Sequence, residues 1–219
     1  NGFTQFGNTR PNSDNDILGL FVYGDGVVAC SGTDIFFSID GSTWLQINKS
    51  SVATSGDNYT TFTGRSTLAR TGQGQCSFAL FEGGAFDYGE LIIADGANKP
   101  FSFRMEGTGI LTTRTFFASE ITVDGSNGVK YVANYDHHLI AAGVQNNLNA
   151  IFYSVYNDPD NFSGSGSGSV VISDQIQGIR GFRTDLIVFA KNSIHKLINI
   201  NDTANIRIDP ITENVGCLS

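Results

Sequence analysis

The sequence predicts an all-β fold, a β-propeller-like repeat of antiparallel sheets. Three observations support this prediction: a strand phrase recurs along the 219 residues, Gly is abundant at 26 residues, and no long stretch has the i, i+3, i+4, i+7 apolar spacing of an amphipathic helix. We expect one propeller-like domain over residues 1–219. We also expect flanking repeats, since the chain begins without Met and ends just after what looks like the start of a strand.

The recurring phrase is an apolar run, a small turn of Gly, Asp or Asn, and a second apolar run. Its copies start at positions 27, 91, 139 and 186, giving intervals of 64, 48 and 47 residues. Short strands repeating every 40–50 residues or so are typical of propeller blades. The copies are Val27–Cys30 with Ile35–Ser38, Leu91–Ala94 with Pro100–Phe103, Leu139–Ala142 with Ile151–Ser154, and Leu186–Phe189 with Ser193–Lys196.

A second pattern precedes two of these copies. Ile17–Tyr23 and Ile176–Phe182 share the skeleton Ile-x-Gly-(Leu/Ile)-x-x-(Tyr/Phe), and Tyr131–Leu139 gives a looser version. Asp25-Gly26 then supplies a hairpin signal before the first copy. We therefore expect a repeat unit of at least two strands, with further strands between the copies.

The segments between the copies complete the predicted organisation. Residues 1–16 are expected to form a leading loop, residues 48–75 an insertion of extra strands or a long loop, and Ser163–Ser169 a flexible Gly/Ser loop inside one repeat. Further strands are predicted at Thr60–Thr63, Cys76–Phe81, Arg114–Ala118 and Ile121–Val123, the last two as outer strands of the second unit.

Charge and cysteine content exclude several classes of function. The formal net charge of −8 repels phosphate backbones, which argues against conventional nucleic-acid binding. No apolar segment approaches the ~20 residues that cross a bilayer. Cys30, Cys76 and Cys217 are odd in number and widely spaced, which fits neither a disulfide framework nor a zinc site. We expect buried, reduced thiols and an intracellular folding compartment.

Ser38–Trp44 resembles a shortened Asp-box, the turn of sialidase-type propellers. In that turn the Asp and Ser side chains bond the turn amides and the Trp packs beneath the hairpin. The Asp-box builds the fold and takes no part in catalysis. A sialidase also needs an arginine cluster, an acid and a Tyr–Glu pair, and its Phe-Arg-Ile-Pro element has no counterpart in this sequence.

The remaining polar groups suggest no active site. His137 and His138 are adjacent, so on a strand they face opposite sides and cannot share a metal; we expect surface or turn histidines. His195 follows Ser193, but no G-x-S-x-G elbow supports a triad. Asp158–Asn161 places two carboxylates in one turn, and the turn is favoured over a calcium site because the EF-hand pattern is missing. We expect no catalytic residue, cofactor or metal.

One ordered series of motifs resembles a known family. Its members, in chain order, are Ile151–Ser154, Asn157–Phe162, Ile176–Ile179 and Leu186–Ile194. Together they resemble the propeller-bearing tail nozzle, or tail tubular protein B-like, proteins of short-tailed bacteriophages, which carry "IYWS…DP..F", "I.GL" and "LVVF…SI..L" elements. The sequence departs from them at His195 and Lys196, where an aromatic residue or Arg is commoner, and in the Gly/Ser tract.

The resemblance implies a non-enzymatic structural protein of the phage virion, assembled in the host cytoplasm. It would form a homo-oligomeric ring, a hexamer, around the tail channel. Its partners would be the head-to-tail adaptor and tail fibre or spike proteins. Genomic DNA would pass through during ejection without sequence-specific binding, and no small-molecule substrate is implied. Two alternatives stay open: a carbohydrate- or receptor-binding β module of a tail fibre, and a sialidase-like propeller glycosidase.

Overall fold

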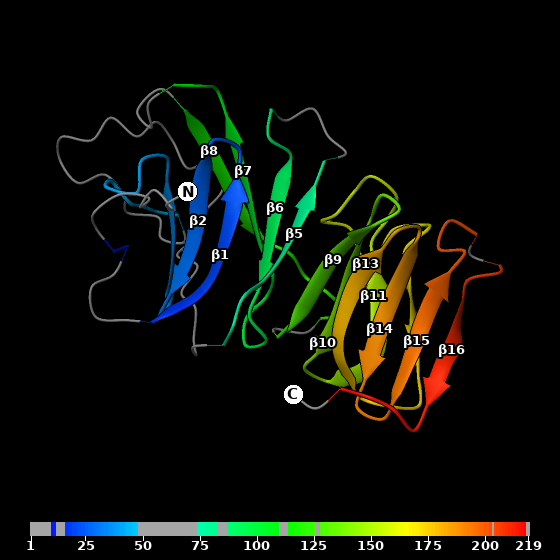
Figure 1. Cartoon of the computed structure of the whole chain (residues 1–219). Helices are drawn as coiled ribbons and strands as arrows, with labels where there is room; N and C mark the ends of the chain where they lie inside the picture. Colours follow the sequence, from blue (N-terminus) through cyan, green and yellow to red (C-terminus); the bar gives the residue numbers. More distant parts are fainter. Residues whose placement is uncertain are drawn as a thin grey trace.

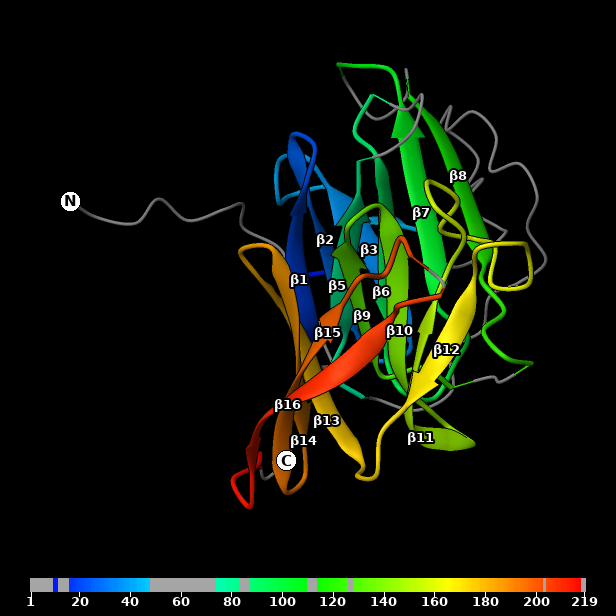
Figure 2. The same ribbon diagram turned by 90° about the vertical axis from the view of Figure 1, so that its right-hand side faces the viewer.

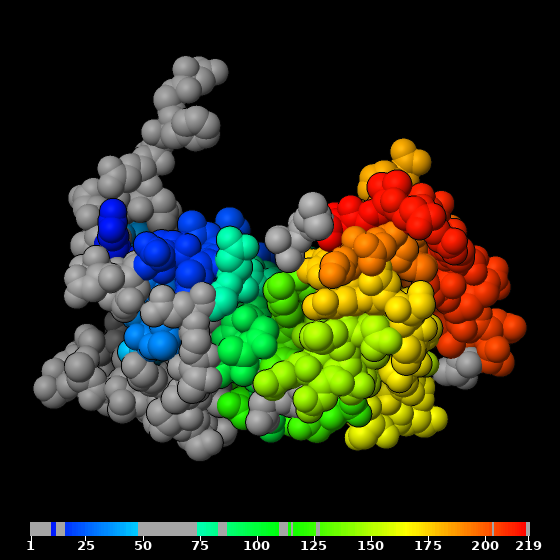
Figure 3. Space-filling view, turned by 90° about the horizontal axis from the view of Figure 1, so that it is seen from below, coloured from blue at the N-terminus to red at the C-terminus, as the bar shows by residue number. Residues whose placement is uncertain are grey.

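A computed structural model describes residues 10–11, 16–47, 74–82, 87–109, 114–125, 128–202 and 204–217. These residues contain sixteen strands and no helix, arranged as four four-stranded antiparallel sheets. The predicted all-β, propeller-like fold is confirmed. The sheets follow one another across the molecule in chain order, as the progression from blue to red shows (Figure 3).

Each sheet is a meander in which strands adjacent in sequence pair side by side (Figure 1). Sheet 1 contains β1 (Ile17–Tyr23), β2 (Gly26–Ser31), β3 (Asp34–Ser38) and β4 (Leu45–Gln46). Sheet 2 contains β5 (Ser77–Phe81), β6 (Glu90–Ala94), β7 (Phe101–Glu106) and β8 (Thr115–Glu120). Sheet 3 contains β9 (Tyr131–Tyr135), β10 (His138–Val144), β11 (Asn147–Tyr153) and β12 (Gly168–Val171). Sheet 4 contains β13 (Ile176–Phe182), β14 (Asp185–Ala190), β15 (Ser193–Ile198) and β16 (Arg207–Glu213).

The recurring strand phrase forms the second and third strands of every sheet, as the repeat predicts. The Ile-x-Gly skeleton forms the first strands β1 and β13, and both strands shift register at the same point, between Ile17 and Gly19 and between Ile176 and Gly178. At Gly19 a Cβ atom would come within 2.7 Å of the Phe78 ring, so the bulge of β1 needs glycine for the close approach of β5.

Of the four other predicted strands, two are present, one is not a strand, and one lies outside the described residues. Cys76–Phe81 contains β5, and Arg114–Ala118 overlaps β8, the outer strand of sheet 2. Ile121–Val123 does not extend this sheet as a strand: Ile121 and Val123 are buried between sheets 2 and 3, where they fill the core. Thr60–Thr63 lies outside the described residues, as do residues 48–73 and most of residues 1–16.

The Gly/Ser tract at Ser163–Ser169 is not wholly a loop. Its last two residues belong to β12, and Gly168 pairs with Tyr153 of β11. A Cβ atom at Gly168 would lie 2.5 Å from the Tyr153 hydroxyl oxygen, so glycine lets the strand pass close to this ring. The prediction of a flexible loop is therefore wrong for these two residues. Residues with small side chains can also form a strand that packs closely against a large side chain.

Three apolar cores hold the four sheets together, one between each consecutive pair. Core 1–2 contains Tyr23, Val28, Cys30, Ile35, Phe37, Leu45, Ile47, Leu91, Ile93, Phe101, Phe103, Met105, Phe116 and Ala118. Core 2–3 contains Ala79, Ile92, Ala94, Ile121, Val123, Val129, Val132, Leu139, Ala141 and Val144. Core 3–4 contains Ile140, Ala142, Ile151, Tyr153, Ile172, Ile176, Leu186, Val188, Ala190, Leu197 and Ile200.

This layering explains the burial of β6, β10 and β14. Every residue of β6 and β10 is buried, because sheets 2 and 3 are covered on both faces. In β14 buried and partly exposed residues alternate, because only one face of sheet 4 is covered. The four sheets do not close into a ring. Figure 2 looks onto the sheet 4 end of the molecule.

Candidate functional site

The first strands of all four sheets converge on one cavity of about 520 Å³. Its walls come from β1, β5, β9 and β13, which is the place where a propeller has its axial channel. The lining residues are Phe21, Cys76, Ser77, Phe78, Ala79, Leu80, Val132, Ala133, Asn134, Ile179, Arg180 and Gly181.

Polar side chains in this cavity connect neighbouring sheets. The Ser77 hydroxyl accepts a hydrogen bond from the Val132 N–H at 3.1 Å, and the Asn134 amide donates to the Leu80 carbonyl at 3.0 Å. β5 and β9 belong to different sheets, so these side-chain bonds join strands that share no ladder. The polar groups of Ser77 and Asn134 therefore serve the junction between sheets 2 and 3.

A pair of carboxyl groups, one buried and one exposed, lies at the same junction. Glu90, the first residue of β6, is 5% exposed, and its carboxylate accepts a hydrogen bond from the Ser102 hydroxyl. Asp160, in the turn between β11 and β12, brings its own carboxyl within hydrogen-bonding reach of Glu90. Burial, and next the charge of Asp160, raise the pKa of Glu90 to about 7. Desolvation also raises the pKa of Asp160, so both carboxyl groups bind a proton more tightly than they would in water.

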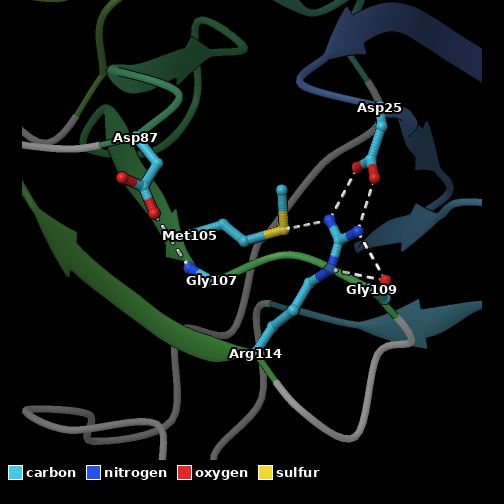
Figure 4. A network of polar contacts seen from close by, with 6 residues as sticks. All are labelled: Asp25, Asp87, Met105, Gly107, Gly109 and Arg114. Carbon is cyan, nitrogen blue, oxygen red and sulfur yellow. Dashed lines mark hydrogen bonds and ion pairs between the residues drawn. The ribbon is translucent and has the colours of Figure 1, made fainter.

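Sheets 1 and 2 are joined by a buried guanidinium (Figure 4). Arg114 is 0% exposed and forms two bonds to Asp25, Nη1 to Oδ1 at 2.6 Å and Nη2 to Oδ2 at 2.5 Å. It also donates to the Gly109 carbonyl and contacts the Met105 sulfur at 3.1 Å. Hydrogen bonding from Arg114 lowers the pKa of Asp25. Asp25 lies in the β1–β2 turn, so this pair fixes the turn against the end of sheet 2.

Tyr23 makes a second polar link between sheets 1 and 2. Its hydroxyl donates to the Gly89 carbonyl at 2.7 Å and accepts from the Met105 N–H at 3.2 Å. Burial raises the pKa of this hydroxyl well above its ordinary value, so Tyr23 stays protonated and keeps donating.

The β3–β4 turn has the hydrogen bonds expected of an Asp-box. The Asp40 carboxylate accepts from the backbone N–H groups of Ser42 and Thr43, both at 2.8 Å, and the Ser38 hydroxyl accepts from the Gly41 N–H. The bond from Thr43 is the main reason that the pKa of Asp40 is lowered. The predicted turn chemistry is confirmed for Ser38 and Asp40, and it shapes the hairpin.

Replacing Asp40 with alanine should reduce the free energy of unfolding by about 1 kcal/mol. Two backbone N–H groups of the turn lose a charged acceptor and must hydrogen-bond to water instead. Equilibrium urea denaturation measures the loss. Asp40→Asn retains a side-chain oxygen and is the matched control; it should lose less than the alanine variant. Equal losses in the two variants would show that the turn amides do not need this acceptor.

Two of the three histidines are buried, which corrects the prediction of surface or turn histidines. His137 lies in the β9–β10 turn and is exposed, as predicted. His138 is 2% exposed: its Nδ1 lies 2.6 Å from the Ser154 carbonyl oxygen and its Nε2 lies 2.9 Å from Asn201 Oδ1. His195 is also buried, in β15. Polar partners make this burial possible: Ser193 on the same strand for His195, and Ser154 and Asn201, which follow β11 and β15, for His138.

Ser193 and His195 lie on the same face of β15, with Ser193 Oγ 2.8 Å from His195 Nε2. A hydroxyl and an imidazole at this distance are the first two members of a nucleophile–base arrangement. They border a cavity of about 380 Å³ that Asp174 and Glu213 also line. The Asp174 oxygens accept the backbone N–H groups of Gln175 and Asn192, so this carboxylate orders the adjacent loops.

The three cysteines differ in their exposure to solvent. Cys30 is buried and Cys76 partly buried, whereas Cys217 is exposed, which corrects the expectation that all three are buried; Cys217 follows β16 on the surface. Asp158–Asn161 forms a turn, in which the Asn161 N–H donates to the Asp158 carbonyl at 3.3 Å. Among the described residues no three His, Cys, Asp or Glu side chains are grouped to hold a metal, and no helix is long and apolar enough to span a membrane.

Sequence reasoning identified Asp160 but missed Glu90, Asp25 and Arg114. A carboxylate placed directly before an apolar strand, as Glu90 is before Leu91, was the only local signal of a buried acid.

No family model matches the sequence, and no curated protein matches it.

Proposed function

We propose that the protein is a non-enzymatic structural component of a short-tailed bacteriophage tail, of the nozzle type, and that it assembles as a ring around the channel through which DNA leaves. The observation that carries this proposal is the ordered motif series of Ile151–Ile194. Its pieces fall on β11, the β11–β12 turn, β13, and β14 with β15, so the resemblance follows consecutive elements of two packed sheets.

The layered architecture suits a mechanical role. Three apolar cores join the sheets in series, and close-packed interiors resist deformation. The net charge of −8 favours free passage of DNA, since like charges repel. Sheet 4 also presents apolar side chains on its outer face, which supports contact between subunits.

Negative-stain electron microscopy of the purified protein tests the proposal. We expect ring-shaped particles with a central channel. Particles without a channel would contradict a nozzle role. Binding on a glycan array would instead favour the receptor-binding alternative, and turnover of a fluorogenic sialoside would favour the glycosidase.

A further inference from the structure

The cavity among the first strands of the four sheets has one charged residue in its wall. This residue is Arg180 of β13, and all the other lining residues are neutral. Arg180 is exposed, and it forms no hydrogen bond or ion pair with any other residue that the structure describes. The positive charge at this cavity therefore has no counter-charge among the described residues.

Aromatic side chains supply apolar surface to the same cavity. Phe21 of β1 and Phe78 of β5 stack with their ring centroids 5.4 Å apart and an angle of 23° between their planes. Both rings pack against core 1–2 but stay partly exposed. The cavity volume of about 520 Å³ lies within the usual range for sites that hold one small molecule. An apolar group that covers the two rings removes their exposed surface from water, which favours binding.

The uncharged polar side chains of the wall are engaged within the chain. The Ser77 hydroxyl exchanges hydrogen bonds with the backbone of Val132, and the Asn134 amide donates to the Leu80 carbonyl. Arg180 is therefore the side chain that decides which charge a ligand carries. Its planar guanidinium presents N–H donors in a fork that matches the two oxygens of a carboxylate. A phosphate group suits the cavity less well, because its second negative charge would lack a partner.

We propose that this cavity binds a small molecule that carries one carboxylate and an apolar, aromatic group. The carboxylate pairs with Arg180, and the apolar group covers Phe21 and Phe78. All four walls belong to sheets that the structure describes, so the site lies within a single chain. The inference goes beyond the proposed tail role and does not depend on it.

Three probes that share one apolar tail test the proposal by isothermal titration calorimetry. They are phenylbutyrate, phenylbutanol and phenylbutylamine, which are anionic, neutral and cationic at pH ~7. We expect phenylbutyrate to bind at least about 10-fold more tightly than phenylbutanol, because only the carboxylate gains charge-assisted hydrogen bonds from Arg180. Phenylbutylamine should bind most weakly, since its charge has the same sign as that of the guanidinium.

Arg180→Gln removes the charge from the wall. It should bind phenylbutyrate about 10-fold more weakly than wild type does and leave the affinity for phenylbutanol unchanged. Arg183→Gln is the matched control, because Arg183 is an exposed arginine in the β13–β14 turn that does not line the cavity. This control should bind all three probes as wild type does.

A second pair of variants tests the space rather than the charge. A Cβ atom added at Gly181 or at Gly178 would meet no atom within 4 Å, so both positions accept a side chain without a clash. Gly181 lines the cavity and Gly178 does not. Gly181→Leu should therefore weaken the binding of both phenylbutyrate and phenylbutanol, whereas Gly178→Leu should bind like wild type. Circular dichroism checks that the variants keep their strands.

Cys76 reports on the position of the ligand in the unaltered protein. It lines the cavity and is partly buried, whereas Cys217 is exposed and lies outside the lining. Saturating phenylbutyrate should slow the alkylation of Cys76 by iodoacetamide several-fold and leave that of Cys217 unchanged, as peptide mass spectrometry measures.

No detectable binding, equal affinities for the three probes, an Arg180→Gln variant that binds phenylbutyrate like wild type, or unchanged alkylation of Cys76 would each overturn the proposal. Ring-shaped particles are expected in electron micrographs with or without the probe. Failure of ligand binding would therefore leave the nozzle proposal standing, and absence of rings would leave the ligand site standing.

Discussion

Replacing Asp25 with alanine should lower the free energy of unfolding by about 3 kcal/mol, more than replacing its partner Arg114 with methionine, which should cost about 1–2 kcal/mol. The asymmetry follows from burial. Arg114 is 0% exposed, so loss of Asp25 leaves a guanidinium in the interior without its counter-charge. Asp25 is 51% exposed, so loss of Arg114 leaves a carboxylate that water can solvate. Urea denaturation with an unchanged m-value measures both losses.

The double variant tests this reasoning further. With the guanidinium absent, removal of Asp25 should add little, so the double variant should be about as stable as Arg114→Met alone. Asp25→Asn keeps the shape without the charge and should fall between Asp25→Ala and wild type. Equal losses for Asp25→Ala and Arg114→Met would mean that the buried charge does not dominate the contact shown in Figure 4.

Glu90 should make the protein less stable as the pH rises from about 4.5 to about 7. The pKa of Glu90 is raised in the folded state from 4.5 to about 7, so the folded chain binds this proton more tightly than the unfolded chain. The stability that Glu90 contributes is therefore greatest below pH ~4.5, falls as the pH rises through the folded pKa, and then levels off. The fall from this group is on the order of 3 kcal/mol. The groups that face it are Asp160, Ser102 and Arg104, with Asp158 beside Asp160.

Glu90→Gln should remove this fall, because glutamine stays neutral and can still accept from Ser102. At pH 8 the variant should therefore be more stable than wild type by a similar amount. Thermal or urea unfolding between pH 4 and 8 gives the comparison. Glu120→Gln removes an exposed carboxyl of sheet 2 and is the matched control. A Glu90→Gln profile parallel to that of wild type would show that the pKa of Glu90 is not raised in the folded protein.

The sequence predicted the first three strands of most sheets well and the fourth strands, apart from β8, poorly. The second and third strands of each sheet were found because they are apolar runs of adequate length. The fourth strands differ: β4 has two residues, β12 begins in the Gly/Ser tract, and β16 alternates polar with apolar residues. These fourth strands lie at the outer edges of their sheets, bond to one neighbour and are partly solvated, so composition does not constrain them as it does a central strand.

The pairs that join the sheets could not be predicted, because they link residues far apart in sequence. Arg114 and Asp25 are separated by 89 positions, and each is unremarkable in its local segment. Their contact depends on how sheet 1 packs on sheet 2, which a repeat pattern does not specify. The same holds for His138, whose partner Asn201 lies 63 positions away. The repeat predicts that cores exist between sheets, but not which polar groups are buried there.

The meander topology has a consequence for the order of folding. Each ladder joins strands that are neighbours in sequence, so a sheet can complete its backbone hydrogen bonds from a short stretch of newly made chain. The face of that sheet that packs on the next sheet, however, stays exposed to water until the next sheet has been made. During synthesis the growing chain therefore exposes the uncovered apolar face of its newest sheet until the next sheet forms and covers it.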